Sequence, residues 1–382
     1  MKDLKNGVHD PTIIKHKDTY YLFSTDTQQP KTSGVPIRSS KDLIHWDFEK
    51  SALSGVPKEA SEWSNAVGLW APEIIKVENE FRMYYSASSF GSTTSFIGLA
   101  TAPHPLGPWE DKGEVVKTSP DLTDHNAIDA NICKDRHGNQ WMVYGSFFGG
   151  IYIAQIDKNT GKFSETRFGK RIAKRPKIVD TAIEGPFIIY NPETDYFYLF
   201  VSYDSLNDFY NIRVARSKSI DGPYVDFDGN DMLNQEINPE KVGTKLLGGY
   251  QFSEEPILYA PGHNSILVDG DNHFLVHHAR RKPHSDQFFL QIRTLFWLEN
   301  GWPVAAPCEY NGDYEIIQLA STDNKKEWEV ILFEGPDIQK SKEISDIFSF
   351  IEETNALYKV YKNNHQFFIT GMTDKGYTFF GK

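Results

Sequence analysis

The stretch Val8-His9-Asp10-Pro11-Thr12-Ile13-Ile14 decides how this chain is interpreted, because its plan recurs four more times. Asp10 stands three positions before Ile13, at the head of an apolar strand pattern. The recurrences are Ala71-Pro72-Glu73-Ile74-Ile75, Asp129-Ala130-Asn131-Ile132, Glu184-Gly185-Pro186-Phe187-Ile188 and His263-Asn264-Ser265-Ile266-Leu267. Aligned on the apolar residue, the lead positions are Asp10, Ala71, Asp129, Glu184 and His263. Three carboxylates and a histidine in one structural position predict an active site at the centre of a radial fold.

The spacing from one lead position to the next is about 60 residues for the first three steps and longer for the last step, from Glu184 to His263. In the first unit, the apolar strand Ile13-Ile14 is followed by the turn Lys17-Asp18 and the aromatic-rich strand Tyr20-Tyr21-Leu22-Phe23. Asp-Gly, Gly-Asn and Asn-Pro pairs between β-branched and aromatic runs are typical of hairpins. About four short strands per unit predict a propeller blade, and no long stretch has helical apolar periodicity.

The fold class expected from these units is therefore all-β, with a five-bladed β-propeller over residues 1–303. Residues 304–382 break the repeat but keep strand-like runs, such as those around Trp328 and Gln366. We expect this part to form a small C-terminal β-domain, either a sandwich or a barrel, without a catalytic pattern of its own.

The composition argues against several classes of protein. With a net charge of −12 and a pI near 5.5, the chain is a poor candidate for binding nucleic acid or an anionic membrane, and a neutral substrate fits better. The two cysteines, Cys133 and Cys308, form no disulfide framework, and Cys133 is expected to be a buried free thiol. No apolar run approaches membrane-spanning length. Met1–Gly7 lacks the apolar region of a signal peptide, so the expected location is the cytoplasm, or outside the cell if a leader has been removed. We expect a monomer.

Three carboxylates at one position of a radial fold point to a particular chemistry. Close carboxylates repel one another, which raises the pKa of at least one of them. One protonated and one ionised carboxyl are the pair that glycoside hydrolysis requires, because one protonates the leaving oxygen while the other activates water or attacks carbon. A single acid at a strand start is more simply a cap or a turn acceptor. Three in register favour catalysis.

Other residues near the lead positions are candidates for binding. His263 is expected to point into the central channel, where a histidine can hold a metal or a water network. A catalytic metal hydrolase is not favoured, since the sequence has no His-Glu-x-x-His motif. Trp70 and Phe147 flank the lead positions and are candidate stacking surfaces for the apolar face of a sugar, although Phe147 could equally pack in a propeller core.

These motifs resemble the signatures of glycoside hydrolase family 43, in its endo-α-1,5-L-arabinanase branch. The resemblance covers about residues 7–303 and rests on His9-Asp10-Pro11, Leu69-Trp70-Ala71-Pro72-Glu73, Ile128-Asp129-Ala130, Glu184-Gly185-Pro186, Pro261-Gly262-His263-Asn264-Ser265 and Gly145-Ser146-Phe147-Phe148. It implies a five-bladed propeller acting on arabinan or arabino-oligosaccharide.

The resemblance also implies a role for each lead residue. Asp10 is expected to be the general base, Glu184 the general acid, and Asp129 the residue that tunes and orients the acid, with inversion at the anomeric carbon. His263 is expected beside a structural calcium ion, or another ion, in the central channel, and a calcium ion there would have a shell that is mostly water. His9 and Ser146, which stand in the quoted motifs, join Trp70 and Phe147 as candidate substrate-binding residues.

Two alternatives remain open at this point. Within the glycosidases, the protein could be an exo-acting α-L-arabinofuranosidase or a β-xylosidase, because loop lengths around the funnel decide between endo and exo action. In a different class, it could be a non-catalytic carbohydrate-binding propeller, an alternative that intact carboxylates at three lead positions disfavour.

Overall fold

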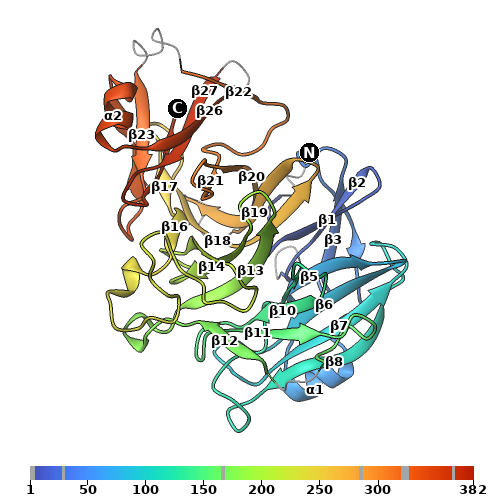
Figure 1. The fold of residues 1–382 in the computed structure, drawn as a ribbon. Coiled ribbons are helices and arrows are strands. Elements are labelled where there is room, and N and C mark those ends of the chain that lie inside the picture. Colours follow the sequence, from blue (N-terminus) through green and yellow to red (C-terminus); the bar gives the residue numbers. More distant parts are fainter. Residues whose placement is uncertain (1–4, 28–30, 165–167, 284–286, 320–326, 364–365) are drawn as a thin grey trace.

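The computed structural model describes residues 5–27, 31–164, 168–283, 287–319, 327–363 and 366–382 (Figure 1). Strands dominate these residues, and the two α-helices among them, α1 (Lys58–Ser64) and α2 (Ile347–Glu353), are short. The 3-10 helices η1 (Lys177–Val179) and η2 (Pro239–Lys241) lie in loops. The all-β class predicted from the sequence is confirmed.

Four sheets contain four strands each, and within each sheet the strands are hydrogen-bonded in sequence order or its reverse. The first sheet contains β1 (Thr12–His16), β2 (Thr19–Phe23), β3 (Pro36–Ser40) and β4 (Asp47–Ser51). The second contains β5 (Trp70–Val77), β6 (Glu80–Ala87), β7 (Ser95–Ala102) and β8 (Glu110–Thr118). The third contains β9 (Asn131–Lys134), β10 (Gln140–Tyr144), β11 (Ile151–Ile156) and β12 (Lys170–Ala173). The fourth contains β13 (Ile183–Asn191), β14 (Tyr196–Tyr203), β15 (Asn211–Ser217) and β16 (Thr244–Leu247).

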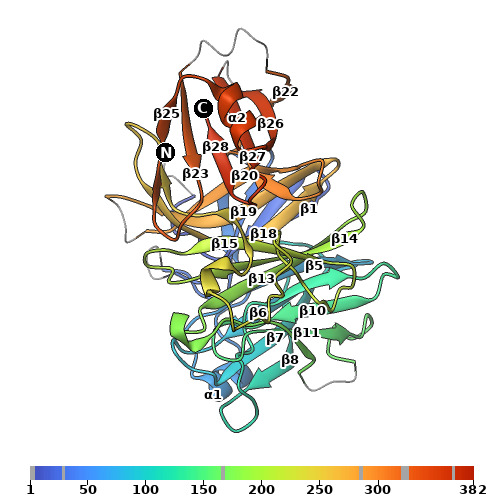
Figure 2. The same cartoon turned by 60° about the vertical axis from the view of Figure 1, so that its left-hand side comes forward.

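Two further sheets have six strands each. The fifth, in hydrogen-bonded order, contains β21 (Pro303–Ala305), β20 (Phe289–Trp297), β19 (Asn272–Arg281), β18 (Leu258–Asp269), β17 (Tyr250–Gln251) and β24 (Gln339–Lys340). The sixth contains β22 (Glu315–Ile317), β26 (Leu357–Asn363), β27 (Gln366–Met372), β28 (Thr378–Gly381), β23 (Trp328–Leu332) and β25 (Lys342–Ile344). The sixth sheet and α2 lie together at one end of the molecule (Figures 1 and 2). The C-terminal residues also give the fifth sheet an edge strand, because β24 pairs in parallel with β17.

Residues with positive φ lie in the turns of several hairpins. Lys17, Asp195 and Gly270 have φ values of 57°, 55° and 61° in the turns of the β1–β2, β13–β14 and β18–β19 hairpins. Left-handed residues in tight turns match the right-handed twist of the flanking strands. The hairpin predicted at Lys17-Asp18 is confirmed, and the other two turns follow the same pattern.

Apolar side chains pack between consecutive sheets, and the fifth sheet packs in the same way against the first. Each cluster joins residues of consecutive sheets: Phe23 with Met83, Ile97 with Met142, Val143 with Val201, Phe200 with Leu275, and Val276 with Leu22; the cluster of Phe200 and Leu275 also includes residues of the sixth sheet. The starting strands follow the same order, because β1 contacts both β5 and β18. This packing brings the beginnings of distant repeats close together.

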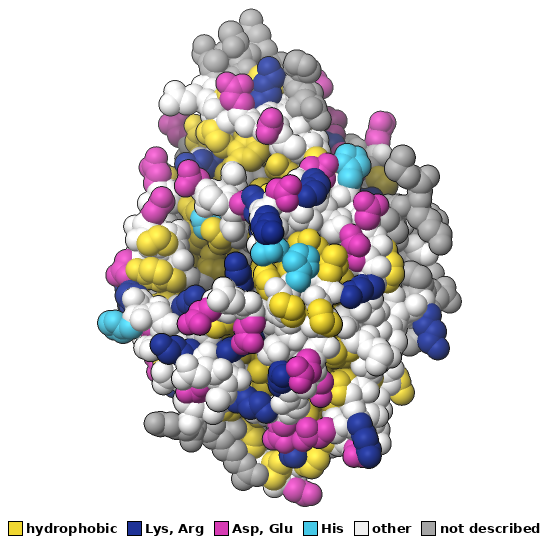
Figure 3. All heavy atoms as spheres, turned by 90° about the vertical axis from the view of Figure 1, so that its right-hand side faces the viewer, with side chains coloured by type: hydrophobic (Ala, Val, Ile, Leu, Met, Phe, Trp, Pro, Cys, Tyr) yellow, Lys and Arg dark blue, Asp and Glu magenta, His cyan; other side chains and the backbone are white. Residues whose placement is uncertain are grey.

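Three smaller findings bear on the predictions. Cys133 is buried and free, as predicted. Among the described helices, none has the length and apolar character needed to cross a membrane. Positive and negative side chains are interspersed over the face drawn in Figure 3, so this face presents no extended region of one sign.

Candidate active site

The backbone has an uncommon conformation at or near the starts of β1, β5, β9 and β13, and at one position within β18. Asp10, Ala71, Asp129, Gly185 and His263 all have left-handed φ values between 39° and 61°. Four of them are the lead residues predicted from the sequence. In the fourth unit the equivalent residue is Gly185, because Glu184 pairs with Ser202 as Trp70 pairs with Ser86 in the second unit, and the same register shift follows each. The alignment that put Glu184 itself at this position is therefore wrong by one residue.

The N–H group of each of these residues donates to a side chain, and this pattern sets the geometry of the site. The acceptor comes from a neighbouring sheet, where it lies in a strand or within two residues of one end of it, so the bonds fix adjacent strands relative to one another. The bonds are Ala71 to Thr25 Oγ1 at 2.8 Å, Asp129 to Ser86 Oγ at 3.0 Å, Gly185 to Asp129 Oδ2 at 3.1 Å, His263 to Ser202 Oγ at 2.7 Å and Asp10 to His278 Nδ1 at 3.2 Å.

The buried carboxylate of Asp10 lies among one hydroxyl and three imidazoles. Its Oδ2 accepts a hydrogen bond from Thr25 Oγ1 at 2.6 Å. Its Oδ1 lies 3.1 Å from His263 Nδ1, 3.3 Å from His9 Nε2 and 3.5 Å from His278 Nδ1. These contacts hold both oxygens of Asp10 in place, and the histidine contacts join the first sheet to the fifth.

Glu184 is held by two hydroxyl groups. Ser146 Oγ donates to its Oε2 at 2.9 Å, and Tyr210 donates to its Oε1 at 2.7 Å. Burial raises the pKa of Glu184 above its ordinary value, although the positive field of His263 and the two hydroxyl donors act in the opposite direction. A carboxyl with a raised pKa keeps its proton at higher pH, as a general acid must.

Asp129 and His263 complete the cluster. Burial raises the pKa of Asp129 to about 7; His263 lowers it, and the nearby Glu184 and Asp10 raise it. Burial lowers the pKa of His263, but the three carboxylates outweigh that effect, so its net shift is upward. The predicted lead acids and His263 therefore share one electrostatic environment, as expected for groups that converge.

Glu73 is a buried acid beside this cluster that sequence reasoning overlooked. Thr12 Oγ1 donates to its Oε2 at 3.0 Å, and Asn131 Nδ2 donates to its Oε1 at 2.6 Å. The Asn131 side chain in turn accepts the N–H of Ile188 at 2.9 Å. Burial raises the pKa of Glu73 to about 7, which these donors offset in part. Glu73 thus connects the strands that follow Asp10, Asp129 and Glu184.

Comparison with known proteins identifies the family of this chain. The family model described as "Glycosyl hydrolases family 43" matches residues 4–303. The chain belongs to this family.

Relatives of this family 43 protein include one named for endo action and one named for exo action. It is 36% identical to a Thermotoga petrophila protein named extracellular endo-α-(1→5)-L-arabinanase, over 89% of this chain and 77% of the relative. It is 35% identical to the extracellular exo-α-(1→5)-L-arabinofuranosidase of Cellvibrio japonicus, over 78% of this chain and 85% of the relative. The crystal structure of an endo-1,5-α-L-arabinanase from Thermotoga petrophila superposes with a TM-score of 0.85 at 30% identity, covering 98% of this chain and 97% of that one.

The candidate substrate-binding residues of the family 43 protein lie at different places around the cluster. Ser146 contacts Glu184 directly, and His9 stacks on Phe288 with ring centroids 4.1 Å apart. Trp70 begins β5, and Phe147 follows Ser146 in a turn after β10, where its N–H donates to a backbone carbonyl. Trp70 and Phe147 are both partly exposed. Contact of these four residues with substrate stays a prediction.

Several functional contacts of the family 43 protein were missed from the sequence. Thr25, Tyr210 and His278 contact Asp10 or Glu184 but stand outside the recurring lead motif. Thr25 could have been found from the sequence. Thr25, Ser86 and Ser202 are all hydroxyl residues near the end of the second strand in their units. Each accepts the N–H of the next lead residue.

The residues around Asp10 form a poor set of ligands for the expected calcium ion. Among the described residues, the ligand atoms of His9, Asp10 and His278 lie within 4.8 Å of one another. Calcium binds through oxygen, whereas this set offers two imidazoles and one carboxylate. His263, the predicted metal residue, directs Nδ1 at Asp10. The donor set therefore gives the calcium expectation no support.

Proposed function

We propose that the protein hydrolyses α-1,5-L-arabinofuranosidic linkages of arabinan, as an endo-acting enzyme that inverts the anomeric carbon. The observation that carries this proposal is the shared cluster of Asp10, Asp129 and Glu184, with Glu184 held by two hydroxyl donors. The Thermotoga petrophila relative, named for endo action on this linkage, supports the substrate.

Glu184 is the proposed general acid. Its raised pKa keeps a proton available, and the bonds from Ser146 and Tyr210 aim the carboxyl from two sides. In the reaction, this proton passes to the glycosidic oxygen as the bond from that oxygen to C1 breaks. The departing chain then leaves as an alcohol rather than as a costly alkoxide.

Asp10 is the proposed general base. Thr25 and the neighbouring imidazoles hold its two oxygens on the strand start of the first sheet, whereas Glu184 comes from the fourth. Asp10 would take a proton from water while the water oxygen bonds to C1 on the face opposite the leaving group, which inverts the configuration. The two carboxyls would exchange their protonation states over one turnover.

Asp129 is the proposed orienting residue. Its Oδ2 accepts the N–H of Gly185, the residue that follows the acid, at 3.1 Å. This bond fixes the backbone that carries Glu184, and the charge of Asp129 contributes to the electrostatic field at the site. Asp129 would therefore act through Glu184 rather than on the sugar.

The architecture proposed for this function is a five-bladed propeller with a small appended β-domain. The five sheets that begin with β1, β5, β9, β13 and β18 would be the blades, and packing of the fifth sheet against the first supports closure. The division between the domains would fall near residue 303, where the family match ends. The C-terminal β-domain would contain the sixth sheet.

Location and assembly follow from the same proposal. The names of both relatives place them outside the cell, so a cytoplasmic location has no support, and we propose that this enzyme also acts extracellularly, as a monomer. Gel filtration with light scattering tests the monomer.

The decisive experiment is hydrolysis of linear and branched arabinan, with product sizes followed by chromatography and the anomeric configuration followed by NMR. We expect mixed oligomers and inverted configuration. Asp10→Ala should abolish turnover, and Glu184→Gln should abolish it while keeping oligosaccharide binding. Release of no reducing ends by the wild type, or equal activity of Asp10→Ala and wild type, would refute the proposal.

A second candidate is exo action, which the Cellvibrio japonicus relative favours by its name. The same chromatography separates the two modes. Monosaccharide alone among the earliest products would identify an exo-acting α-L-arabinofuranosidase.

A further inference from the structure

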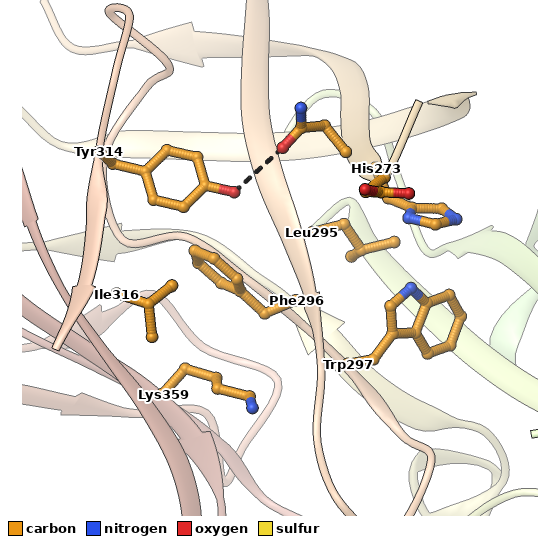
Figure 4. Close-up of a pocket in the computed structure, with 9 residues that line it drawn as sticks. His273, Leu295, Phe296, Trp297, Tyr314, Ile316 and Lys359 are labelled. Atoms are coloured by element: carbon orange, nitrogen blue, oxygen red, sulfur yellow. Dashed lines mark hydrogen bonds between the residues drawn. The ribbon is translucent and has the colours of Figure 1, made fainter. Parts of the chain in front are cut away.

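A second pocket lies between the fifth and sixth sheets (Figure 4). Its volume is about 240 Å³ and it opens to solvent, so it would hold one part of a larger ligand and leave the rest outside. The strand β19 runs from this pocket to the catalytic cluster, since His273 lines the pocket and His278 lies beside Asp10. Five residues of extended strand separate them by roughly 17 Å. The pocket is therefore distinct from the cluster that holds the catalytic acids.

Flat aromatic rings form opposite walls of this pocket. Trp297, at the end of β20, packs on Tyr198 with ring centroids 4.7 Å apart and meets His273 edge-on at 5.7 Å. Tyr314, which precedes β22, meets Phe296 edge-on at 5.6 Å. Figure 4 shows the rings of Trp297 and Tyr314 on different sides of the space. Rings held in this way can stack on the C–H faces of a sugar without losing much conformational freedom on binding.

Polar groups of both signs complete the lining. Asp271 and Asn272 come from the β18–β19 turn, and Lys359 extends from β26 in Figure 4. Burial lowers the pKa of His273, so its neutral imidazole can both donate and accept a hydrogen bond. One carboxylate and one ammonium balance each other, and this fits a neutral polyhydroxylated ligand better than an anion or a cation.

One polar group in the wall is placed for a ligand. Trp297 Nε1 is buried and faces Leu295 in Figure 4, so Trp297 offers the pocket its ring surface and not a donor. Tyr314 already donates to Asn272 Oδ1 at 3.3 Å, a long bond that leaves the amide nitrogen of Asn272 for a ligand.

We propose that this pocket is a second binding site for an arabino-oligosaccharide segment of the polymer substrate. The proposal rests on the proposed function, which supplies the substrate class. A polymer held at one site reaches the other at a raised effective concentration. The pocket would therefore lower the KM for polymer, and it would contribute nothing to a substrate too short to span both sites.

The test uses the full chain carrying Glu184→Gln, so that the oligosaccharide is bound but not cleaved. Calorimetry with arabinohexaose should give two sites in this protein and one after Trp297→Ala is added. Trp297→Phe, which keeps a ring, should retain the second site with weaker affinity. Lys359→Ala should weaken that site about 3-fold. Tyr358→Ala, at the neighbouring exposed position outside the pocket lining, is the matched control and should leave both sites unchanged.

A second measurement, in chains that retain Glu184, gives the consequence for hydrolysis. Trp297→Ala should lower the ratio of activity on long linear arabinan to activity on arabinotriose about 5-fold, with near-ultraviolet circular dichroism as the check on folding. One site in every variant, an unchanged ratio, or equal binding of xylohexaose at the pocket would overturn the inference. Loss of hydrolysis by the wild type would refute the proposed function instead, so the two failures are distinguishable.

Discussion

The hydroxyl of Tyr210 offers a direct test of which carboxyl is the acid. It donates to Glu184 Oε1 at 2.7 Å and stabilises the ionised form more than the protonated form. Replacing Tyr210 with Phe keeps the ring, which stacks on His278 with centroids 5.7 Å apart, and removes only the donor. The pKa of Glu184 should therefore rise further.

The size of this shift follows from the energy of the lost bond. A hydrogen bond to a charged group contributes about 1.5–3 kcal/mol and one to a neutral group about 1 kcal/mol. The difference between the two protonation states is then about 1.4 kcal/mol, which corresponds to about one pKa unit. Ser146→Ala should act in the same direction through Oε2 of Glu184, because Ser146 donates there at 2.9 Å.

The assay is the pH dependence of kcat/KM on a soluble arabino-oligosaccharide. If Glu184 is the acid that must be protonated, the alkaline limb should move to higher pH by about one unit in Tyr210→Phe, and further in the double variant. Tyr358→Phe, at a partly exposed tyrosine on β26, is the control and should leave both limbs in place. Movement of the acidic limb would make Glu184 the base, and movement of neither limb would refute the assignment.

Three further perturbations test the cluster. The pKa of Asp129 is raised to about 7 in the folded protein, so its ionisation lowers the stability of the fold as pH rises from about 4 to about 7. Asp129→Asn should therefore be more stable than wild type by on the order of 1 kcal/mol between pH 5 and pH 8, as measured by thermal unfolding. The activity of this variant should fall. Gly262→Ala would place a Cβ against the ring of Tyr210, so we expect activity to fall at least 10-fold with the melting temperature also lowered; full activity in this variant would contradict the packing. Glu73→Ala should cost about 3 kcal/mol of stability in denaturant unfolding because it leaves several buried donors without an acceptor, whereas Glu73→Gln should cost about 1 kcal/mol; equal losses would argue against the bonding pattern.

Local pattern predicted many of the strands and pointed to the buried acids that the fold brings together. The hairpins at Lys17 and Gly270 were predictable because turn residues and alternating apolar runs act over a few positions. The recurring lead residue could be read for Asp10 and Asp129 because the same frame precedes each apolar strand. What repeats within the chain was therefore accessible before any coordinates.

Features that depend on irregularity or long-range packing were not accessible. Phe187 and Ile188 are both apolar, so an alignment on apolar positions has two possible frames in the fourth unit, and only the strand pairing shows that Ile188 matches Ile74. Tyr210 and His278 reach the acids through tertiary packing, without a fixed spacing from the lead motif. The edge strand β24 pairs with β17 from a distant part of the sequence, and the two-residue pairing leaves no periodic trace.

The contacts of Asp10 with His263 and His278 join the first sheet to the last described repeat, across more than 250 positions of chain. A nascent or refolding polypeptide cannot form this carboxylate environment until its opening and closing repeats have met. Recovery of catalysis during refolding should accordingly trail the recovery of secondary structure, and turnover becomes a reporter of the final docking event.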